Sequence, residues 1–537
     1  MTVISDPPVG MPLRPDRVLR YVTAFCPVCH DEAPDRPLDE VRRLSGYLAE
    51  TEGEVWLVRG CPDHGKVVTH YDEDPEILEY LEQWTAPTKA HAPDTFGNYD
   101  PVPLAYLRGL GEMQTQHTCI LLEDITQSCN LRCPTCFADS SPDLKGVVPY
   151  EEILGNIDQR LDRENGRLDV VMLSGGEPTL HPRFHDLLDA LRDRNVVRVL
   201  VNSNGVLLAR DDALLAALER NRSQVEVYLQ FDGLRKETSL HHRKADLRSI
   251  KQRALQRLSA AGIFTTLTMT AALGVNDDEI GDVIQVALDT PYVGGVSIQP
   301  QFGSGRSTPI NPYQRLTHTG VLKRMGPQTN GVVSWRDMTA LPCSHPHCCS
   351  VGYMVKTDAG EWRSMVSMIG HDRLKEHLGL VANRIADHEI PDELRVVVQE
   401  SLLGLLSEQS SLSHPDVSDL IRNICETCDL GISSLLKLAG SAVGRQEQLR
   451  ATIGERIKRI TVKPFMDMNT MIEERLVQCC VHVGTRSQAD MDQCAPFCAV
   501  QAWAPLGRTK LSEVAGRRAG SVPLTLQPTQ PEVEVPT

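Results

Sequence analysis

The chain has 537 residues, of which 41% are hydrophobic and 23% charged, and its net charge at pH 7 is −16. This charge argues against a broad nucleic-acid surface, and against electrostatic docking on an anionic bilayer, because both would present phosphate groups to an acidic protein. At roughly 100–200 residues per domain, the length allows about three domains. The 16 cysteines are too sparse for a small disulfide scaffold and too many to be incidental.

No targeting signal is predicted at the ends of the given sequence. The first 15 residues lack a cationic and an apolar region, so they do not resemble a signal peptide. No run reaches about 18 apolar residues, so no transmembrane segment is predicted. We therefore expect a cytoplasmic protein, in which cysteines more often bind metals or react than form disulfides. Residues 1–19 and 506–537 are expected to be disordered, and residues 86–114 to form a linker.

Residues 20–85 carry two metal-ligand motifs. Cys26 and Cys29 form a CxxC pair, and Cys61 and His64 form a CxxH pair. This pattern suits a tetrahedral metal with sulfur and nitrogen ligands, as in zinc-ribbon and rubredoxin-like folds. The spacing does not choose between zinc and iron. His64 is the least certain ligand, because it could cap the loop while another cysteine completes the site.

Residues 115–310 alternate short apolar strands with amphipathic helices. Six strands are predicted, at 118–125, 169–174, 198–202, 226–231, 265–270 and 295–299. Helices are predicted between them, for example at 182–194 and 277–288. Such repeats predict right-handed βαβ units and a parallel sheet. Six repeats favour an α/β fold with a partial (β/α)6 barrel, and an open doubly wound sheet is the alternative. In either fold, ligands bind at the carboxyl ends of the strands.

The first predicted strand leads into the sequence TQSCNLRCPTCFAD. It places Cys129, Cys133 and Cys136 in a CxxxCxxC loop at a strand's carboxyl end. Three thiolates on one loop can bind three irons of a [4Fe–4S] cluster and leave the fourth iron open. Zinc would require a fourth ligand, which this loop does not contain. The other interpretation, three unconnected buried thiols, does not account for the spacing.

This loop, following the first strand of a β/α repeat, resembles the radical S-adenosylmethionine (SAM) superfamily. The resemblance implies that the three cysteines are catalytic: their cluster would cleave SAM reductively, and the resulting 5′-deoxyadenosyl radical would take hydrogen from an unactivated carbon. It also implies sensitivity to oxygen. One departure is that Thr135 precedes Cys136, where an aromatic residue is usual, and Phe137 follows it.

The later strands end in residues that suit a SAM pocket. The second strand ends in a GGEP turn, which the resemblance implies binds the amino group of SAM. The third and fourth strands end in NSNG and QFDG, whose polar groups could hold the ribose or the methionine part, although both are also ordinary turns. The candidate SAM-binding residues are Gly175, Gly176, Glu177, Pro178, Asn202, Ser203, Asn204, Gln230 and Asp232. The loop QPQFGSGR after the sixth strand suits a phosphate or carboxylate, or is a plain connection.

Residues 311–505 are predicted to be an auxiliary iron–sulfur region with a helical insertion. Their nine cysteines are Cys343, Cys348, Cys349, Cys425, Cys428, Cys479, Cys480, Cys494 and Cys498. They could hold two further [4Fe–4S] clusters with one thiol spare, although Cys425 and Cys428 could instead form a zinc knuckle or a structural pair. Apolar runs at 393–409 and 432–440 predict a helical subdomain, or else a lid for an apolar substrate. Cys119 is interpreted as a buried strand thiol.

The order of all these motifs over residues 20–500 is similar to the group that contains archaeal tetraether lipid synthases and dihydropterin methyltransferases. That resemblance implies carbon–carbon bond formation on a lipid chain, or C-methylation of a pterin-like substrate. A flavodoxin or ferredoxin would be the reductant, and a peripheral membrane contact would serve a lipid substrate. The alternatives are a peptide-modifying radical SAM maturase and a non-catalytic iron–sulfur electron-transfer protein.

Overall fold

The structure, a computed structural model, describes the larger part of the chain. The described residues are 15–33, 41–84, 117–307, 309–376, 450–451, 454–484 and 495–503. The predictions that fall outside these ranges are those for the linker at 86–114, the tail at 506–537, the apolar runs at 393–409 and 432–440, Cys425, Cys428 and Cys494. Within the described residues, the helices are all too short or too polar to cross a membrane.

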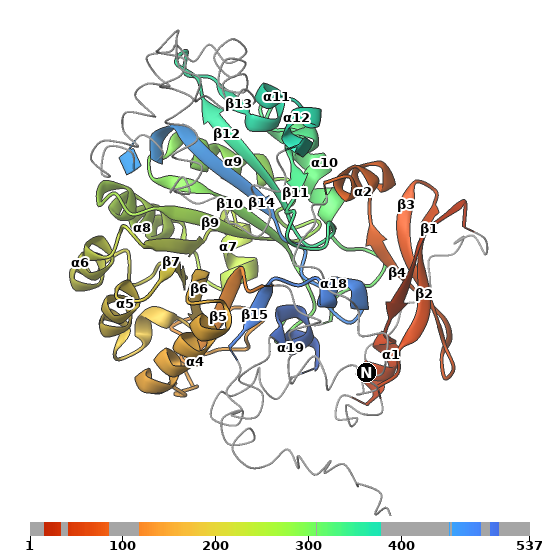
Figure 1. Ribbon diagram of the computed structural model, residues 1–537, viewed down its shortest axis with the longest axis horizontal. Coiled ribbons are helices and arrows are strands. Elements are labelled where there is room, and N and C mark those ends of the chain that lie inside the picture. The colour runs from red at the N-terminus through yellow and green to blue at the C-terminus, as the bar shows by residue number, and fades with distance from the viewer. Residues whose placement is uncertain are drawn as a thin grey trace, which may run out of the picture.

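The N-terminal unit is a four-stranded antiparallel sheet in the order β1-β2-β3-β4 (Figure 1). Its elements are β1 (Arg17–Ala24), α1 (Pro27–Glu32), β2 (Leu44–Thr51), β3 (Glu54–Cys61), β4 (Gly65–Asp72) and α2 (Pro75–Glu82). The disorder predicted over 1–19 is wrong for residues 17–19, because they belong to β1, which pairs with β2. Leu57 of β3 belongs to the same hydrophobic cluster as Ile120 and Met172 of the next unit, so the two units share a core.

The second unit is built on a parallel sheet whose six predicted strands lie side by side in chain order (Figure 1). They are β5 (Ile120–Thr126), β6 (Leu168–Gly175), β7 (Val196–Ser203), β8 (Val225–Gln230), β9 (Thr265–Ala271) and β10 (Val293–Pro300). A doubly wound sheet reverses its strand order at a switch point, and this order does not reverse. The predicted partial barrel is therefore confirmed.

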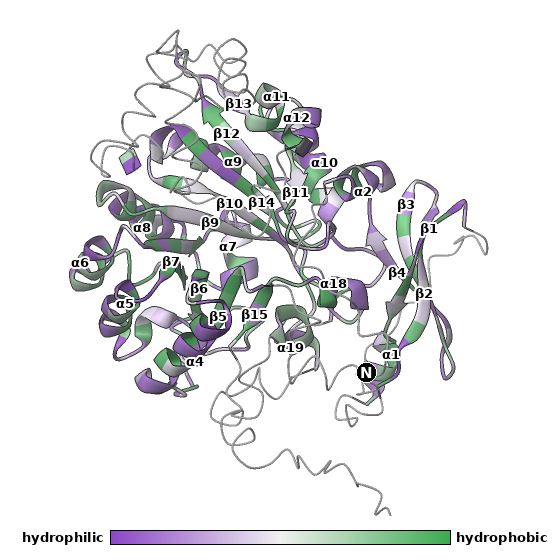
Figure 2. Ribbon diagram, in the orientation of Figure 1, coloured by the Kyte–Doolittle hydropathy of each residue, from purple (hydrophilic) through white to green (hydrophobic). Residues whose placement is uncertain are grey.

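Alternate residues of the barrel strands belong to two different hydrophobic clusters, as the twofold repeat of a strand requires. Val199 and Val201 of β7 pack in one cluster with Leu187 and Leu191 of α5, whereas Leu200 joins the cluster on the other face. The helices between the strands are α4 (Tyr150–Arg163), η3 (Pro178–Leu180), α5 (Phe184–Arg192), α6 (Asp212–Arg220), α7 (Lys236–Arg243), α8 (Arg248–Ala260) and α9 (Ile280–Asp289). Figure 2 shows both hydrophilic and hydrophobic residues on these helices, as helices between core and solvent require.

Strands from the C-terminal third extend the sheet at both edges, which the sequence did not predict. β14 (Ile457–Val462) pairs in parallel with β10, and β15 (Val481–Val483) pairs in parallel with β5. The other elements of this region are α10 (His318–Gln328), η4 (Trp335–Asp337), β11 (Thr339–Ala340), β12 (Ser350–Lys356), β13 (Trp362–Ser364), α11 (Met365–Ile369), α12 (His371–Glu376), α18 (Glu473–Val477), β16 (Ala495–Pro496) and α19 (Phe497–Trp503). The pairing of β15 brings Cys479 and Cys480 beside the start of β5.

Candidate metal and cofactor sites

The CxxxCxxC loop follows β5 and lies at the carboxyl ends of the barrel strands, where ligands of such sheets bind. Cys129, Cys133 and Cys136 line one cavity of about 90 Å³. The same cavity is lined by Gly175, Gly176, Glu177, Asn202, Ser203, Asn204 and Gln230. The structure therefore brings together every residue predicted for the cluster and SAM except Pro178 and Asp232.

The three thiols are arranged for a cluster rather than for a single metal ion. Among the described residues, two groups bring three or more metal-ligand atoms within 4.8 Å of one another, and the CxxxCxxC loop is not one of them. A single zinc ion draws its ligands around one point, whereas each thiolate of a [4Fe–4S] cluster binds a different iron. Within the loop, directly after Cys129, the buried Nδ2 atom of Asn130 has no hydrogen-bond partner. The donor set and this orphaned N–H both fit a sulfide-bearing cluster.

Burial raises the pKa of two of the loop thiols, Cys129 and Cys136. It raises the pKa of Cys129 to about 12, with a further contribution from the Glu177 carboxylate. Burial also raises the pKa of Cys136, and the nearby Arg306 guanidinium opposes that rise. Iron binds the thiolate, so the metal must displace these protons as the cluster assembles.

The GGEP turn after β6 is shaped by the cluster loop beside it. Gly175 has a φ of +111°, and a Cβ atom there would collide with the carbonyl oxygen of Thr126. A Cβ atom on Gly176 would collide with the carbonyl oxygen of Ser128. The N–H of Gly176 donates to the Thr126 carbonyl at 2.6 Å. Both glycines are therefore needed for the turn to contact the cluster loop.

Glu177 is buried and held rigidly at the cavity wall. Its carboxylate accepts hydrogen bonds from Oγ1 of Thr179 at 2.5 Å, Oγ of Ser203 at 2.9 Å and the N–H of Asn204 at 2.8 Å. Burial raises the pKa of Glu177, and these hydrogen bonds oppose the rise. Pro178 begins η3 immediately after it and does not line the cavity.

The end of β7 both supports the cluster loop and lines the cavity. Nδ2 of Asn204 donates to Oδ1 of Asn130 at 2.7 Å and lies 3.8 Å from the sulfur of Cys129. Nε2 of Gln230 donates to Oδ1 of Asn202 at 2.9 Å. Asn204 is therefore fixed to the cluster loop, and Asn202 and Gln230 are fixed to each other, before any ligand binds.

Asp232 lies behind Arg243, and Arg243 lines the cavity in its place. The Asp232 carboxylate accepts from Nε and Nη2 of Arg243 at 2.6 Å each. Nη2 also donates to Gln230 at 3.0 Å, and Nη1 lies 3.8 Å from the sulfur of Cys133. Burial opposes ionisation of Asp232, yet Arg243 holds its pKa below the usual value. The sequence analysis missed Arg243, although a buried carboxylate requires a cationic partner.

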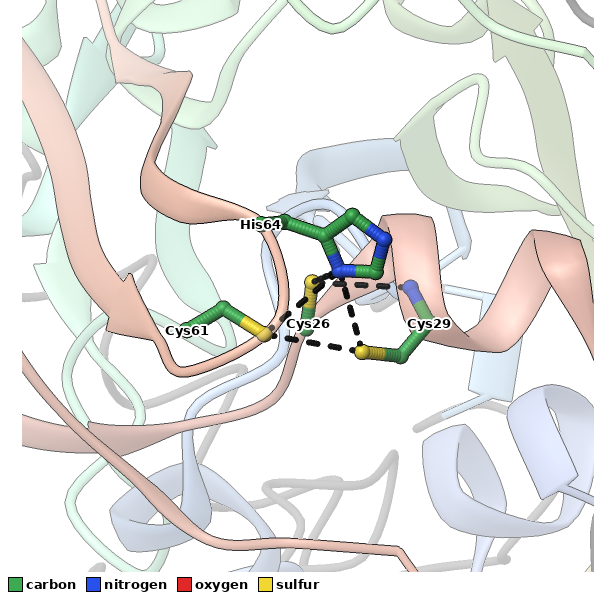
Figure 3. A group of neighbouring side chains, drawn as sticks. All are labelled: Cys26, Cys29, Cys61 and His64. Carbon is green, nitrogen blue, oxygen red and sulfur yellow. Dashed lines mark hydrogen bonds between the residues drawn. The ribbon is translucent and has the colours of Figure 1, made fainter.

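Cys26, Cys29, Cys61 and His64 of the N-terminal unit converge on one point (Figure 3). Nδ1 of His64 lies 3.2 Å from the sulfur of Cys29, 3.5 Å from that of Cys61 and 3.7 Å from that of Cys26. Its other nitrogen, Nε2, lies 2.9 Å from the carboxylate of Glu32. A carboxylate on the second nitrogen is the usual support of a metal-binding histidine, so this contact favours His64 as the candidate fourth ligand.

Cys119 is the buried thiol that the sequence predicts, and it also belongs to a second group of potential metal ligands. The sulfurs of Cys119, Cys343 and Cys480 lie within 4.8 Å of one another. Nε2 of His117 lies 3.1 Å from the sulfur of Cys119. The pairing of β15 with β5 explains this contact, because the N–H of Cys119 donates to the carbonyl of Cys480 at 3.0 Å.

Four further cysteines, Cys348, Cys349, Cys479 and Cys498, line a cavity of about 170 Å³, which Cys119 and Cys480 also line. Burial raises the pKa of Cys498 to about 12; Arg475 opposes the rise and Cys348 adds to it. Nε of Arg475 lies 3.3 Å from the sulfur of Cys348. A guanidinium among buried thiols balances the charge that a thiolate-bound cluster would carry.

Two family models match the chain. The radical SAM superfamily model matches residues 124–287, and a model described as the HMPTM N-terminal zinc ribbon domain matches residues 18–73. The chain therefore contains a radical SAM domain and an N-terminal zinc ribbon. The predicted [4Fe–4S] cluster, SAM and ribbon metal agree with both domains.

Known proteins are similar to this chain to different extents. The 7,8-dihydro-6-hydroxymethylpterin dimethyltransferase of Methanocaldococcus jannaschii is 26% identical over 88% of this chain and 92% of its own length. The antilisterial bacteriocin subtilosin biosynthesis protein AlbA of Bacillus subtilis strain 168 is 29% identical over 31% of this chain and 36% of its own. Among solved structures, Streptococcus suis SuiB bound to S-adenosylmethionine has a TM-score of 0.34, 14% identity, and coverage of 40% of this chain and 48% of that one.

Proposed function

We propose that this chain, whose residues 124–287 are a radical SAM domain, is an enzyme that forms a carbon–carbon bond at an unactivated carbon. The observation that carries the proposal is the cavity in which the three loop cysteines, Glu177 and Arg243 face one another. When bound there, the cluster and SAM supply an organic radical that can take a hydrogen atom from an inert C–H bond.

The residues of the cavity offer complementary partners for the ammonium group, the carboxylate and the ribose of SAM. Glu177 is a fixed acceptor for the ammonium group. Arg243 has Nη1 free of its ion pair with Asp232, so this nitrogen can donate to the SAM carboxylate. The amides of Asn202 and Gln230 can bond the ribose hydroxyls. Charge-assisted bonds of this kind would hold the methionine part of SAM beside the cluster loop.

Two substrate classes fit the proposed reaction. The name of the Methanocaldococcus jannaschii relative, which matches nearly the full length, supports C-methylation of a reduced pterin. The apolar residues of the larger cavity, among them Ile120, Val170 and Leu200, support coupling at a lipid chain. In both cases a new carbon–carbon bond forms. A flavodoxin or ferredoxin in a reducing cytoplasm would supply the electrons.

The alternative functions have less support. The similarity to AlbA covers about a third of the chain, so it does not extend a peptide substrate to the whole protein. An electron-transfer protein would have four protein ligands for its cluster, and the CxxxCxxC loop supplies three.

Release of 5′-deoxyadenosine tests the proposed reaction. Anaerobically reconstituted protein, given dithionite and SAM, should release it, and Cys133→Ala should abolish the release while the ribbon keeps its metal. Cys349→Ser removes a thiol outside the CxxxCxxC loop. It shows whether the loss of release is specific to that loop. No release from protein with an intact cluster would refute the enzymatic function.

The substrate class is decided by a deletion strain. Mass spectrometry of its lipid and pterin extracts should show loss of a coupled lipid or of a C-methylated pterin. Restoring the gene should restore the missing compound, and restoring the Cys133→Ala variant should not. Unchanged extracts of both kinds would exclude both substrate classes.

A further inference from the structure

The loop between β10 and α10 contains four residues, Gly303, Ser304, Gly305 and Arg306, which we call the GSGR clasp. A glycine-rich loop at this position suits an anion site, but the groups of the clasp are bonded to protein. They contact the CxxxCxxC loop on one side. On the other side they contact the C-terminal cysteine region, by which we mean the described part of residues 311–505.

Arg306 makes most of the contacts with the cluster loop. Its Nε donates to the carbonyl of Cys133 at 3.0 Å, Nη1 to the carboxylate of Asp139 at 2.7 Å and Nη2 to the carbonyl of Ser140 at 2.6 Å. Its backbone N–H donates to the carbonyl of Cys136 at 3.0 Å. The acceptors run from Cys133 to Ser140, just past the end of the loop, and include two of the three cluster cysteines.

The backbone of the clasp lies directly against the same loop. Gly305 has a φ of +56°, and a Cβ atom on it would lie 2.5 Å from the carbonyl oxygen of Phe137 and 2.6 Å from that of Cys136. Only glycine permits this approach. Oγ of Ser304 lies 3.2 Å from the Phe137 carbonyl.

The opposite side of the clasp is bonded to the region that carries Cys498. Oγ of Ser304 donates to Oε1 of Gln501 on α19 at 2.9 Å, and the N–H of Gly303 donates to Asp467 at 2.8 Å. Next to Asp467, the N–H of Met466 donates to the sulfur of Cys498 at 3.3 Å. One short loop thus contacts both cysteine regions.

We propose that the GSGR clasp couples the radical cluster to the C-terminal cysteine region, with Arg306 as the positioning residue that fixes the CxxxCxxC loop and Gln501 as its support from α19. The proposal rests on the cluster-binding role of that loop and not on the identity of the substrate. The loop would position the iron that binds SAM. Displacing the loop should therefore weaken SAM binding even while the cluster is still bound.

The planar guanidinium of Arg306 allows a positioning role to be distinguished from a purely electrostatic one. A guanidinium reaches three acceptors at once, whereas a lysine ammonium keeps the charge and lacks the planar fork. A purely electrostatic role would therefore be rescued by lysine, and a positioning role would not.

The experiment compares Arg306→Lys and Arg306→Met in the full-length, anaerobically reconstituted protein. Arg257→Lys and Arg257→Met are the controls, because Arg257 pairs with Asp212 on the outside of the barrel. The measurements are iron per chain, the electron paramagnetic resonance (EPR) spectrum of the reduced protein with and without SAM, and 5′-deoxyadenosine release against SAM concentration. Ser304→Ala is the milder variant, informative if an Arg306 variant fails to fold.

Both Arg306 variants should raise the KM for SAM by roughly ten-fold or more, given the sensitivity of such sites to small displacements, and should weaken the SAM-induced change in the EPR spectrum. The Arg257 variants should behave as wild type. Wild-type values for Arg306→Lys would show that Arg306 contributes only its positive charge. Wild-type values for both Arg306→Met and Ser304→Ala would refute the proposed role of the clasp. If wild-type protein released no 5′-deoxyadenosine, the proposed function would be refuted. The EPR response to SAM would still test whether the clasp positions the CxxxCxxC loop.

Gln501→Leu tests the link to α19, with Gln285→Leu on the outer helix α9 as its control. It should move the KM for SAM and the EPR response in the same direction as Arg306→Met, by a smaller factor. Values equal to those of the control would refute the coupling to the C-terminal region, whatever the Arg306 variants show.

Discussion

The sulfur of Cys119 lies 3.4 Å from the sulfur of Cys343, which is 224 residues later in the chain. The two cysteines do not share a sequence motif. Cys119 directly precedes β5, and Cys343 follows β11. Together with Cys480 they form a buried trio at the edge closed by β15.

The trio predicts that Cys119 is a metal ligand in the auxiliary region. Cys119→Ala and Cys343→Ala should lose the same auxiliary metal, because each removes one corner of one site. Iron and zinc analysis with Mössbauer spectroscopy of the purified variants measures this. The radical cluster, assayed by its EPR response to SAM, should remain in both variants. Full metal content in Cys119→Ala would show that Cys119 is a buried thiol that binds no metal.

Glu32 is predicted to tune the ribbon metal through His64. Glu32→Gln should lower the affinity for the metal by roughly 10–100-fold, the usual effect of losing a carboxylate behind a histidine ligand. Asp31→Asn is a matched control, since Asp31 lies next in the same helix and contacts His30, which is not in the ligand group. Competition with a chromogenic chelator gives both affinities, and equal values would remove Glu32 from the site.

Gly176→Ala should damage the radical site without unfolding the protein. The added methyl group would push the cluster loop away at Ser128, and a displacement of about 1 Å can reduce a rate roughly 100-fold. Gly155→Ala, in the middle of α4 with open space around its Cβ position, should be neutral or stabilising. SAM cleavage and thermal unfolding are measured on both; normal SAM cleavage by Gly176→Ala would contradict the close contact.

Asp232→Asn should destabilise the barrel, because it leaves Arg243 buried without its counter-charge, a loss that costs about 3–5 kcal/mol. Adding Arg243→Met should recover part of this stability. It should not recover SAM binding, because the donor facing the cavity is gone. Urea unfolding and SAM titration separate the two effects. Full recovery of both properties would show that the pair has only a structural role.

Acid should weaken the ribbon through His70. Burial, and then Arg315, lower the pKa of His70 to about 4, from a usual value near 6.5. The unfolded chain therefore binds more protons than the folded one between about pH 4 and 6.5, so stability falls as the pH drops through this window, by on the order of 3 kcal/mol in total. His70→Gln should lose less stability than wild type between pH 7.5 and 4.5 in thermal unfolding. Equal losses would assign the acid sensitivity to other groups.

The sequence predicted the barrel well because its signals are local. The predicted strands at 169–174 and 265–270 correspond to β6 and β9 within one residue at each end. The CxxxCxxC loop and the GGEP and NSNG turns each follow a strand, so the sheet itself gathers them at one edge.

What the sequence did not predict depends on contacts between distant segments. β15 has three residues and gains its partner only from β5, so no periodicity reveals it. Arg243 is one of several basic residues in α7, and its role follows from the burial of Asp232. Cys119 has no neighbouring cysteine in the sequence, so its partners emerge only when β5 and β15 pair.

The pairing of β15 with β5 also constrains how the protein is made. During synthesis the outer edge of the first barrel strand stays unpaired until residues 481–483 have left the ribosome, more than 350 residues after β5 itself. An open strand edge invites aggregation, so this interval is one in which a nascent chain needs protection. Cys480 joins Cys119 and Cys343 at that same late moment. A metal could therefore bind all three cysteines of the trio only after Cys480 has emerged, and overproduction that outpaces this step should yield insoluble protein.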